Sequence, residues 1–173
     1  MKAEFNALTA GTLDRALGMM GSLYAEAGAA HHRERARRAA EGLMANPEMG
    51  GVWLIHVSDE RVSDERVNGE RVSDERVSDE RVDGEPVGYL CVTLCYSLEF
   101  DGRFALLDEL YLEAAWRGKG IGAQAIAFAA EWSRARGLAA IRLEVAHTNS
   151  RAVELYRREG FKAHDRHLMT KWL

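Results

Sequence analysis

The segment LDELYLEAAWRGKGIG, residues 107–122, joins an apolar strand pattern to a glycine-rich turn that precedes a helical pattern. Its three glycines allow a ligand to approach the backbone closely. The N–H groups at the start of the following helix attract anions, and Arg117 and Lys119 add two full positive charges. The segment therefore predicts a site for a phosphate or pyrophosphate group at a helix N-terminus.

Two classes of phosphate-binding protein can be compared with this segment. The chain has no GxxxxGK sequence followed by Ser or Thr, which excludes a Walker-type nucleotide hydrolase. Gly118, Gly120 and Ala123 match the GxGxxA dinucleotide fingerprint, and Glu144 follows at roughly the ribose-binding spacing. However, the preceding strand carries two acidic residues, and only about 50 residues follow the motif, fewer than a dinucleotide-binding domain needs. A dinucleotide-binding oxidoreductase is therefore the least favoured interpretation.

Apolar periodicity in the rest of the chain alternates between strand and helix. The predicted strands cover residues 5–9, 51–57, 87–98, 103–113 and 141–147, and a last strand at 161–173 is expected to close the sheet. The predicted helices cover residues 13–27 after a cap at Thr12 or Thr9, 32–45, a largely buried segment ending at Gly137, and a segment from a cap at Asn149 or Ser150 through Arg158. The prediction is a single α/β domain with a mixed sheet covered by helices.

Composition narrows the classes of partner. The chain of 173 residues is 47% hydrophobic, carries a net charge of -4 and fits one domain. We expect no nucleic-acid partner, because such proteins are normally basic, and no membrane partner, because no long apolar run occurs. No secretory signal pattern opens the sequence, so we expect a soluble, cytoplasmic protein. Cys91 and Cys95 would lie about 13 Å apart on one strand, too far for a disulfide, and we expect no metal site.

Residues 57–86 consist of six five-residue units, VSDER with variations, which hold 11 acidic and five basic residues. A period of five forms no apolar stripe on a helix and alternates faces on a strand, so the tract buries little surface. A solvated arm is favoured over a long hairpin that turns at Asn68-Gly69. We interpret residues 58–82 as an expansion within a hairpin loop, with no part in the chemistry.

Two stretches, LDELYLEAAWRGKGIG and LEVAHTNSRAVELYRREGF (residues 143–161), resemble the GNAT superfamily of acyl-CoA-dependent N-acetyltransferases. The first carries the Arg/Gln-x-x-Gly-x-Gly/Ala loop as Arg117, Gly120 and Gly122. The second carries a signature formed by Asn149, Ala152, Tyr156, Gly160 and Phe161. The resemblance covers essentially the whole chain except the repeat. It implies a single domain with a mixed, mostly antiparallel central sheet flanked by helices.

The resemblance also implies acetyl-CoA as co-substrate. Its pyrophosphate would lie on the glycine loop, and its pantetheine arm would bond the backbone of the strand before the loop, where an N–H would stabilise the oxyanion. Asn149 would contact the same arm. The implied cofactor-binding residues are Leu110, Tyr111, Leu112, Arg117, Gly118, Lys119, Gly120, Ile121, Gly122, Ala123 and Asn149.

Acetyl transfer to an amine needs a base, because alkylamines are mostly protonated at pH 7. Glu109 stands where similar enzymes often have a catalytic glutamate, and we expect Asp108, the alternative base, to point to the opposite face of the strand. Tyr156 matches the tyrosine that acts as general acid in many relatives. With no cysteine nucleophile in the motifs, the resemblance implies direct attack of the amine through a tetrahedral intermediate.

The acceptor is the least defined part of the prediction. Four acidic residues are expected to cluster at the cleft and to suit a cationic amine: Glu99, Asp101, Asp108 and Glu109. Residues 96–112 are weakly similar to polyamine acetyltransferases, in which residues placed like Tyr24 and Glu26 line the acceptor pocket. His31 and His32 are expected to be solvated. We expect the acceptor to be a small-molecule amine or a peptide amine. The sequence leaves open whether the chain forms a homodimer.

A second function class stays open at this point. The fold could serve as a non-catalytic acyl-CoA-binding regulatory or interaction domain, with the acidic repeat as its partner-binding element. Under that interpretation Glu109 and Tyr156 would be dispensable, whereas an N-acetyltransferase requires both.

Overall fold

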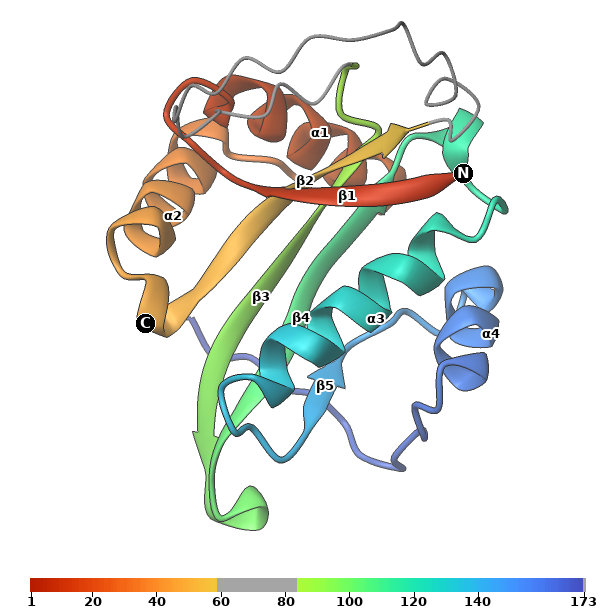
Figure 1. Ribbon diagram of the computed structural model, residues 1–173. Helices are drawn as coiled ribbons and strands as arrows, with labels where there is room; N and C mark the ends of the chain where they lie inside the picture. Colours follow the sequence, from red (N-terminus) through yellow and green to blue (C-terminus); the bar gives the residue numbers. More distant parts are fainter. Residues whose placement is uncertain (59–83, 173) are drawn as a thin grey trace, which may run out of the picture.

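The computed structural model describes residues 1–58 and 84–172, which form a single α/β domain (Figure 1). In this part of the chain five strands form one sheet in the order β1-β2-β3-β4-β5. All neighbours are antiparallel except β4 and β5, which run parallel. The strands are β1 (Lys2–Ala7), β2 (Gly50–Ser58), β3 (Gly88–Ser97), β4 (Gly102–Leu112) and β5 (Ile141–Leu143). The predicted mixed, mostly antiparallel sheet is confirmed.

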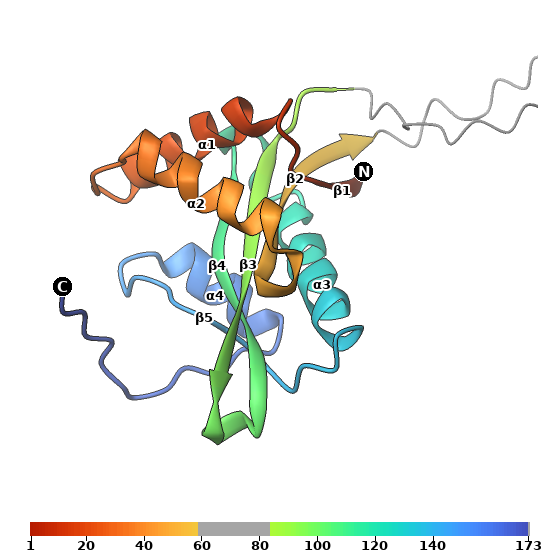
Figure 2. The ribbon, with the colours of Figure 1, turned by 90° about the vertical axis from the view of Figure 1, so that its left-hand side faces the viewer.

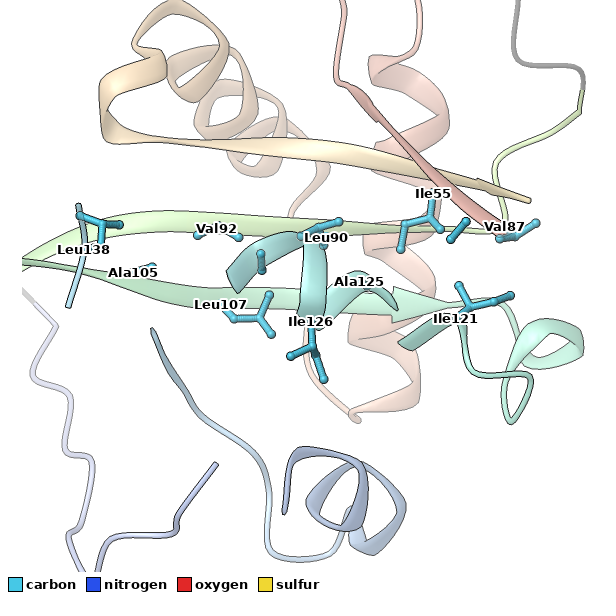
Figure 3. Close-up of a cluster of buried hydrophobic side chains, with 12 residues drawn as sticks. Ile55, Val87, Leu90, Val92, Ala105, Leu107, Ile121, Ala125, Ile126 and Leu138 are labelled. Atoms are coloured by element: carbon cyan, nitrogen blue, oxygen red, sulfur yellow. The ribbon is translucent and has the colours of Figure 1, made fainter. Parts of the chain in front are cut away.

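Four α-helices accompany the sheet in the described residues: α1 (Leu13–Glu26), α2 (Arg33–Ala45), α3 (Ile121–Arg134) and α4 (Ser150–Arg158). Figure 2 shows α1 and α2 on one side of the central strands and α3 on the other. Each face has its own core cluster, because apolar side chains alternate along the strands. Leu90, Leu107, Ile121 and Ala125 belong to the cluster under α3 (Figure 3). Tyr89 and Tyr111 belong to the cluster under α1 and α2.

A β-bulge interrupts this alternation in β4. Cys91 pairs with Glu109 and Val92 pairs with Leu107, which leaves Asp108 as the extra residue. Leu107 and Leu110 consequently both pack on the α3 side, although they are three residues apart. Asp108 and Glu109 lie between them, and the charges of both act on Tyr24 and Cys91 on the α1 side of the sheet. The expectation that these two carboxylates point to opposite faces is therefore wrong, because it assumed strict alternation.

The free edge of β4 begins where β5 stops. β5 pairs only with Ala105–Leu107, so the segment from Asp108 to Leu112 has no strand beside it on that edge within the described residues. The predicted strand at 141–147 is correspondingly shortened to three residues. Leu155 of α4 lies against α3, 3.0 Å from the position that a Cβ at Gly122 would take. The start of α3 and α4 thus lie next to the free edge of β4.

The C-terminal segment does not close the sheet. Residues 161–172 form no strand, and Leu168, Met169 and Trp172 are exposed. Apolar residues in this segment are separated by charged residues and histidines and do not alternate, so no face exists that could be buried against β5. The prediction of a closing strand at 161–173 is therefore wrong for its described residues.

The structure shows which of the two predicted N-cap residues begins α1 and which begins α4. Thr12 is the N-cap residue of α1, but its hydroxyl accepts a bond from Thr9 N at 3.0 Å instead of capping the helix. At α4 the cap is Asn149, whose side chain accepts from Ala152 N at 3.2 Å. This cap hydrogen bond fixes the orientation of the Asn149 side chain.

The strands that flank the repeat are direct neighbours. Val87 N donates to Ile55 O at 2.8 Å, at the start of the antiparallel pairing of β2 with β3. The predicted insertion at 58–82 lies outside the described residues apart from Ser58, the last residue of β2. Among the helices of the described ranges, none is long and apolar enough to cross a membrane.

Candidate active site

Glu109 lies at the centre of a polar cluster between the sheet and α1. The hydroxyl of Tyr89, a fully buried residue on β3, donates a hydrogen bond of 2.8 Å to Glu109 Oε2. Burial raises the pKa of Glu109, and the hydrogen bond from Tyr89 partly opposes that rise. A carboxylate with a raised pKa is a better proton acceptor than an exposed one, so Glu109 has the properties of a general base.

Tyr24 approaches this cluster from the last turn of α1. Burial, together with the negative charge of Glu109, raises the pKa of Tyr24 to about 12. The phenol therefore stays neutral at pH 7 and can donate a hydrogen bond. The structure brings Tyr24, Asp108 and Glu109 together, three of the residues that the sequence assigned to acceptor binding and catalysis.

Asp108 shares the side of the sheet that Glu109 occupies. Shielding of its carboxyl from water raises the pKa of Asp108. Burial raises the pKa of the neighbouring Cys91 thiol, and the charges of Asp108 and Glu109 raise it further. Cys91 is thus held as a neutral thiol, which is a poor nucleophile.

His31 is a member of the cluster that the sequence did not identify. Its ring centroid lies 5.4 Å from that of Tyr24, and its Cδ2 would lie 3.5 Å from a Cβ at Gly21. The Nε2 atom is buried and has no hydrogen-bond partner in the described part of the chain. The expectation that His31 is solvated is wrong, because the connection between α1 and α2 folds the ring back onto α1.

The glycine loop has the backbone that an anion site needs. Gly118 and Gly120 have φ angles of +79° and +82°, which favour glycine over any residue with a Cβ. The N–H groups of residues 118–123 donate no hydrogen bond to any described residue. Arg151 of α4 lies over the loop, with its Nη2 2.9 Å from the position of a Cβ at Gly118. Free N–H groups beside a cation fit a phosphate or pyrophosphate group.

The two cations expected to assist this loop are both engaged elsewhere. Lys119 Nζ lies 4.7 Å from the centroid of the Trp116 ring. Arg117 turns away from the loop and donates to Glu26 Oε1 at 2.8 Å and to Leu112 O at 2.7 Å. Arg151, which the sequence prediction missed, is a cation directly beside Gly118. The available signal was a basic residue in the first turn of α4.

The backbone of β4 offers hydrogen-bonding groups at its free edge. Leu112 O accepts from Arg117 Nε, so this peptide group points away from β3. Since alternate residues of an antiparallel strand direct their N–H and C=O groups to the same edge, those of Leu110 also lie at the free edge. The peptide groups of Tyr111 face β3, and its buried side chain packs under α1.

Tyr156 stands apart from the Glu109 cluster. It packs with the α3-side core, and its ring centroid lies 5.8 Å from that of Phe161 in an edge-to-face contact. Burial raises the pKa of Tyr156, so its hydroxyl keeps its proton at pH 7. It also lines a cavity of about 1070 Å³ between β5, α4 and the C-terminal segment. Glu109 and Tyr156 therefore lie on opposite faces of the sheet.

Glu99 does not join the acidic cluster. It lies in a short 3-10 turn (Leu98–Phe100) at the tip of the β3–β4 hairpin, where both its carboxylate oxygens accept from Arg166, at 3.0 and 3.2 Å. Because a strand rises about 3.3 Å per residue, the tip of the hairpin lies roughly 20 Å from Glu109. The prediction that Glu99 and Asp101 cluster with Asp108 and Glu109 is wrong, because the hairpin extends past the site.

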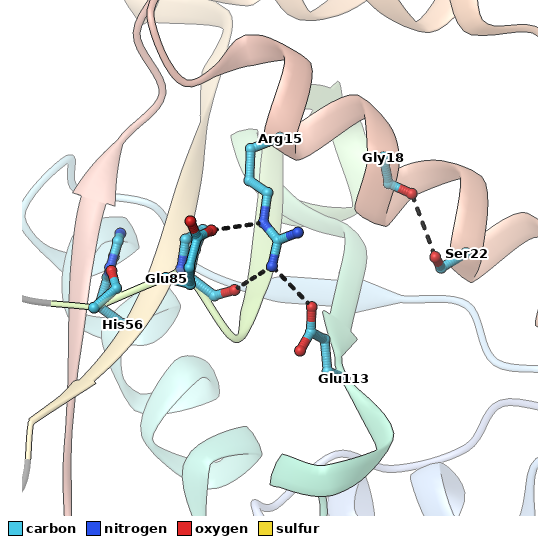
Figure 4. Close-up of polar contacts among 8 residues, drawn as sticks. Arg15, Gly18, Ser22, His56, Glu85 and Glu113 are labelled. Carbon is cyan, nitrogen blue, oxygen red and sulfur yellow. Dashed lines mark hydrogen bonds and ion pairs between the residues drawn. The ribbon is translucent and has the colours of Figure 1, made fainter.

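The start of α1 is fixed over the sheet by Arg15 (Figure 4). Its guanidinium contacts Glu85 at 3.3 Å and Glu113 at 3.1 Å, and it also donates to Pro86 O at 3.3 Å. These partners lie just before β3 and just after β4. Arg15 thus attaches α1 to the two central strands at the end of the helix opposite to Tyr24.

A family model and two related proteins similar to this chain are all acetyltransferases. The family model described as "Acetyltransferase (GNAT) family" matches residues 44–161, more than half of the chain. An uncharacterized N-acetyltransferase of Methanocaldococcus jannaschii is 31% identical over 91 residues, which are 52% of this chain and 39% of that protein. Thialysine N-epsilon-acetyltransferase of Bos taurus is 37% identical over 82 residues, 44% of this chain and 48% of that protein. Each match thus spans less than half of the relative.

The fold was also compared with solved structures. The crystal structure of an integron cassette protein from the mobile metagenome of Cole Harbour Salt Marsh superposes with a TM-score of 0.74. The two sequences are 25% identical, and the alignment covers 98% of this chain and 90% of the other. The likeness therefore extends over both chains nearly end to end.

Proposed function

The chain belongs to the acetyltransferase (GNAT) family, and we propose that it transfers the acetyl group of acetyl-CoA to a primary amine of a small cationic molecule. The observation that carries this proposal is the Glu109 carboxylate. It is bonded to Tyr89 and lies beside the bulge where the edge of β4 becomes free. A half-buried carboxylate next to unpaired strand backbone suits amine acetylation, because it can take the amine proton while a free N–H stabilises the oxyanion.

Acetyl-CoA supplies the activated acyl group when it is bound. The N–H groups of residues 118–123 would hold its pyrophosphate, with the Arg151 guanidinium beside the loop. The peptide groups of Leu110 and Leu112 would bond its pantetheine arm along the free edge of β4. For the latter contact, Arg117 Nε must share or release Leu112 O.

Glu109 would convert the acceptor into a nucleophile. An alkylamine carries a proton at pH 7, since its pKa is near that of lysine, about 10.4. Glu109 Oε1 or Oε2 takes this proton directly or through water, and the raised pKa of Glu109 makes that transfer less unfavourable. Tyr89 keeps the carboxylate in one orientation by its bond to Oε2.

Tyr156 would act as the proton donor on the other side. Its hydroxyl is neutral at pH 7, because burial raises the pKa of Tyr156. The proton on Oη is available to a thiolate, whose pKa near 8.5 makes protonated departure favourable. The acid and the base are thus separate residues on opposite faces of the sheet.

The acceptor class follows from the charges beside Glu109. Asp108 and Glu109 share one side of β4, and their negative charges attract a cation. Tyr24 adds a neutral phenol and an apolar ring that suits an aliphatic chain. The bovine relative bears the name of an acetyltransferase of thialysine, a molecule with a flexible aliphatic amine. We therefore propose a small aliphatic amine, such as thialysine or a polyamine.

Thermal unfolding with acetyl-CoA, and with NAD as control, tests the cofactor. A ligand at 100 times its dissociation constant stabilises the fold by roughly 2.7 kcal/mol, so acetyl-CoA alone should raise the midpoint clearly. Release of free thiol is then measured with thialysine, spermidine, an aminoglycoside and a lysine peptide. Turnover with the first two and little with the peptide supports the proposal. Stabilisation by NAD alone contradicts it.

A further inference from the structure

One guanidinium group connects the two halves of the candidate site. Arg117 donates to Glu26, the last residue of α1, and to the carbonyl of Leu112, the last residue of β4. Arg117 also directly precedes the glycine loop with its free N–H groups. A single side chain therefore joins the helix that carries Tyr24 to the loop that would hold the pyrophosphate.

The surroundings of Arg117 restrict it to one geometry. The guanidinium carbon lies 5.4 Å from the centroid of the Tyr111 ring, and only 28% of the Arg117 side chain is exposed. Fully exposed ion pairs contribute little, because water screens them and ordering long side chains costs entropy. Here three partners order the side chain at once: Glu26, Leu112 O and the Tyr111 ring. Its hydrogen bonds to the first two are both shorter than 2.9 Å.

Glu26 gives this contact a role at the end of α1. The C-terminus of a helix carries a partial negative charge, which an additional carboxylate disfavours. The last turn of α1 contains no basic residue of its own. Arg117 supplies the missing positive charge from outside the helix, so the ion pair stabilises the last turn against fraying.

That last turn shapes the acceptor side of the site. Tyr24 lies two residues before Glu26, and burial, together with the negative charge of Glu109 that acts on it, raises the pKa of Tyr24. His31 packs on the Tyr24 ring from the segment that follows α1. A displacement of the end of α1 would move both rings relative to Glu109.

We propose that Arg117 is a positioning residue of the acceptor pocket: through Glu26 it fixes the last turn of α1, and with it Tyr24, to the glycine loop. The charge of a bound pyrophosphate is then balanced by Arg151, while Arg117 stays with Glu26. This inference rests on the proposed function. It differs from the roles that the sequence suggested, in which Arg117 contacts the pyrophosphate and Glu26 contacts the acceptor.

Four variants test the proposal: R117Q, E26Q, their double mutant and R117K. Gln at position 117 keeps the residue type that the loop motif allows but removes the charge. D14N is the matched control, because Asp14 accepts bonds of 2.6 Å from Arg33 and Arg37 at the other end of the same helix. For each protein we would measure the dissociation constant of CoA by calorimetry, the acceptor KM and kcat, and hydrogen exchange of residues 20–32 without CoA.

The proposal expects R117Q and E26Q to raise the acceptor KM about tenfold each, with the double mutant no worse than either single one, because they break the same contact. The affinity for CoA stays within about twofold of wild type, and hydrogen exchange at residues 20–32 becomes faster. R117K recovers part of the loss, since a lysine can pair with Glu26 but lacks the separate Nε and Nη2 donors with which Arg117 bonds Leu112 O and Glu26. D14N behaves as wild type in kinetics and in exchange at residues 20–32.

Two results would overturn it. The first is unchanged exchange at residues 20–32 in both single variants. The second is a CoA affinity that falls tenfold in R117Q but not in E26Q, with normal acceptor KM, which would make Arg117 a phosphate ligand. A wild-type protein that binds no CoA would instead refute the proposed function. The exchange data, recorded without CoA, would still decide whether Arg117 and Glu26 position α1.

Discussion

The hydroxyl of Tyr89 donates a 2.8 Å hydrogen bond to Glu109 Oε2 across the β3–β4 pair, although Tyr89 lies opposite Tyr111 and Glu109 lies opposite Cys91. The contact is therefore diagonal between strands and joins residues that are 20 positions apart. Tyr89 is fully buried, so water does not compete for its phenol. The bond orders the carboxylate that the proposed function uses as its base.

Replacing Tyr89 by Phe should raise the pKa of Glu109 further. A bond to the ionised carboxylate favours the charged form, and its loss leaves burial less opposed. The acidic limb of the pH profile of kcat/KM should move to higher pH. The free energy of unfolding should fall by about 1 to 3 kcal/mol at neutral pH, the cost of losing a bond to a charged group. An unmoved acidic limb would mean that Glu109 is not the titrating base.

Glu109→Gln should separate activity from stability. Loss of the base should lower kcat about 10²- to 10⁴-fold and leave CoA binding unchanged. The pKa of Glu109 is raised by folding above its ordinary value of 4.5, so ionisation destabilises the folded state. The variant should therefore have a higher Tm than wild type at pH 7, and the difference should disappear as the pH falls below about 4. A variant with a lower Tm at pH 7 would contradict the burial argument.

Tyr156→Phe should lower kcat about 10²-fold without a change in CoA affinity, because it removes the hydroxyl group that donates the proton and keeps the ring. The edge-to-face contact with Phe161 keeps its ring geometry, so Tm should stay within about 2 °C of wild type. Stopped assays of thiol release and a thermal scan would measure both. Full activity in this variant would show that Tyr156 is only a core residue and not the proton donor.

Arg151→Gln should weaken CoA binding about tenfold and make it less sensitive to salt, because the guanidinium lies beside Gly118. Arg158→Gln, in the last turn of the same helix, is the matched control and should bind CoA as wild type does. Calorimetric titrations at two salt concentrations compare the two variants. Equal affinities would show that the loop N–H groups alone hold the pyrophosphate.

Deletion of residues 58–82 should leave kcat and KM within about twofold of wild type. The deletion joins β2 to β3 through Asp83-Gly84, two residues suited to a tight hairpin turn. Shortening a loop costs little stability when the paired strands stay intact. Lost acetylation in a protein that still binds CoA would give the repeat a part in the chemistry.

Most of the fold could be predicted from local patterns. The helices α1, α2 and α4 begin and end within one or two residues of their predicted bounds, because caps and apolar periodicity act over a few residues. Gly118 and Gly120 adopt the positive φ angles for which glycine is needed. The closing strand at 161–173 could not be judged in this way, since a strand exists only when a partner offers an edge.

The site was predictable in part. Glu109, Tyr156 and the glycine loop stand in motifs of contiguous sequence, so the sequence identified them as candidates. The bulge at Asp108 leaves no such trace, because LLDELYL reads as a regular strand until it is aligned with β3. Glu99 was misplaced for a similar reason: the length of the hairpin beyond the site depends on the β3–β4 register.

The sequence by itself determined the order of elements, the loop at 118–123 and its family, since each of these depends on neighbouring residues and their backbone preferences. Only the tertiary structure decided which side chains meet. Tyr89 bonds Glu109 across the β3–β4 pair, and His31 packs on the ring of Tyr24 at the end of α1. Arg117 pairs with Glu26 rather than turning into the loop. Such contacts follow from strand register, a bulge and helix packing over long sequence separations, and no local pattern encodes them.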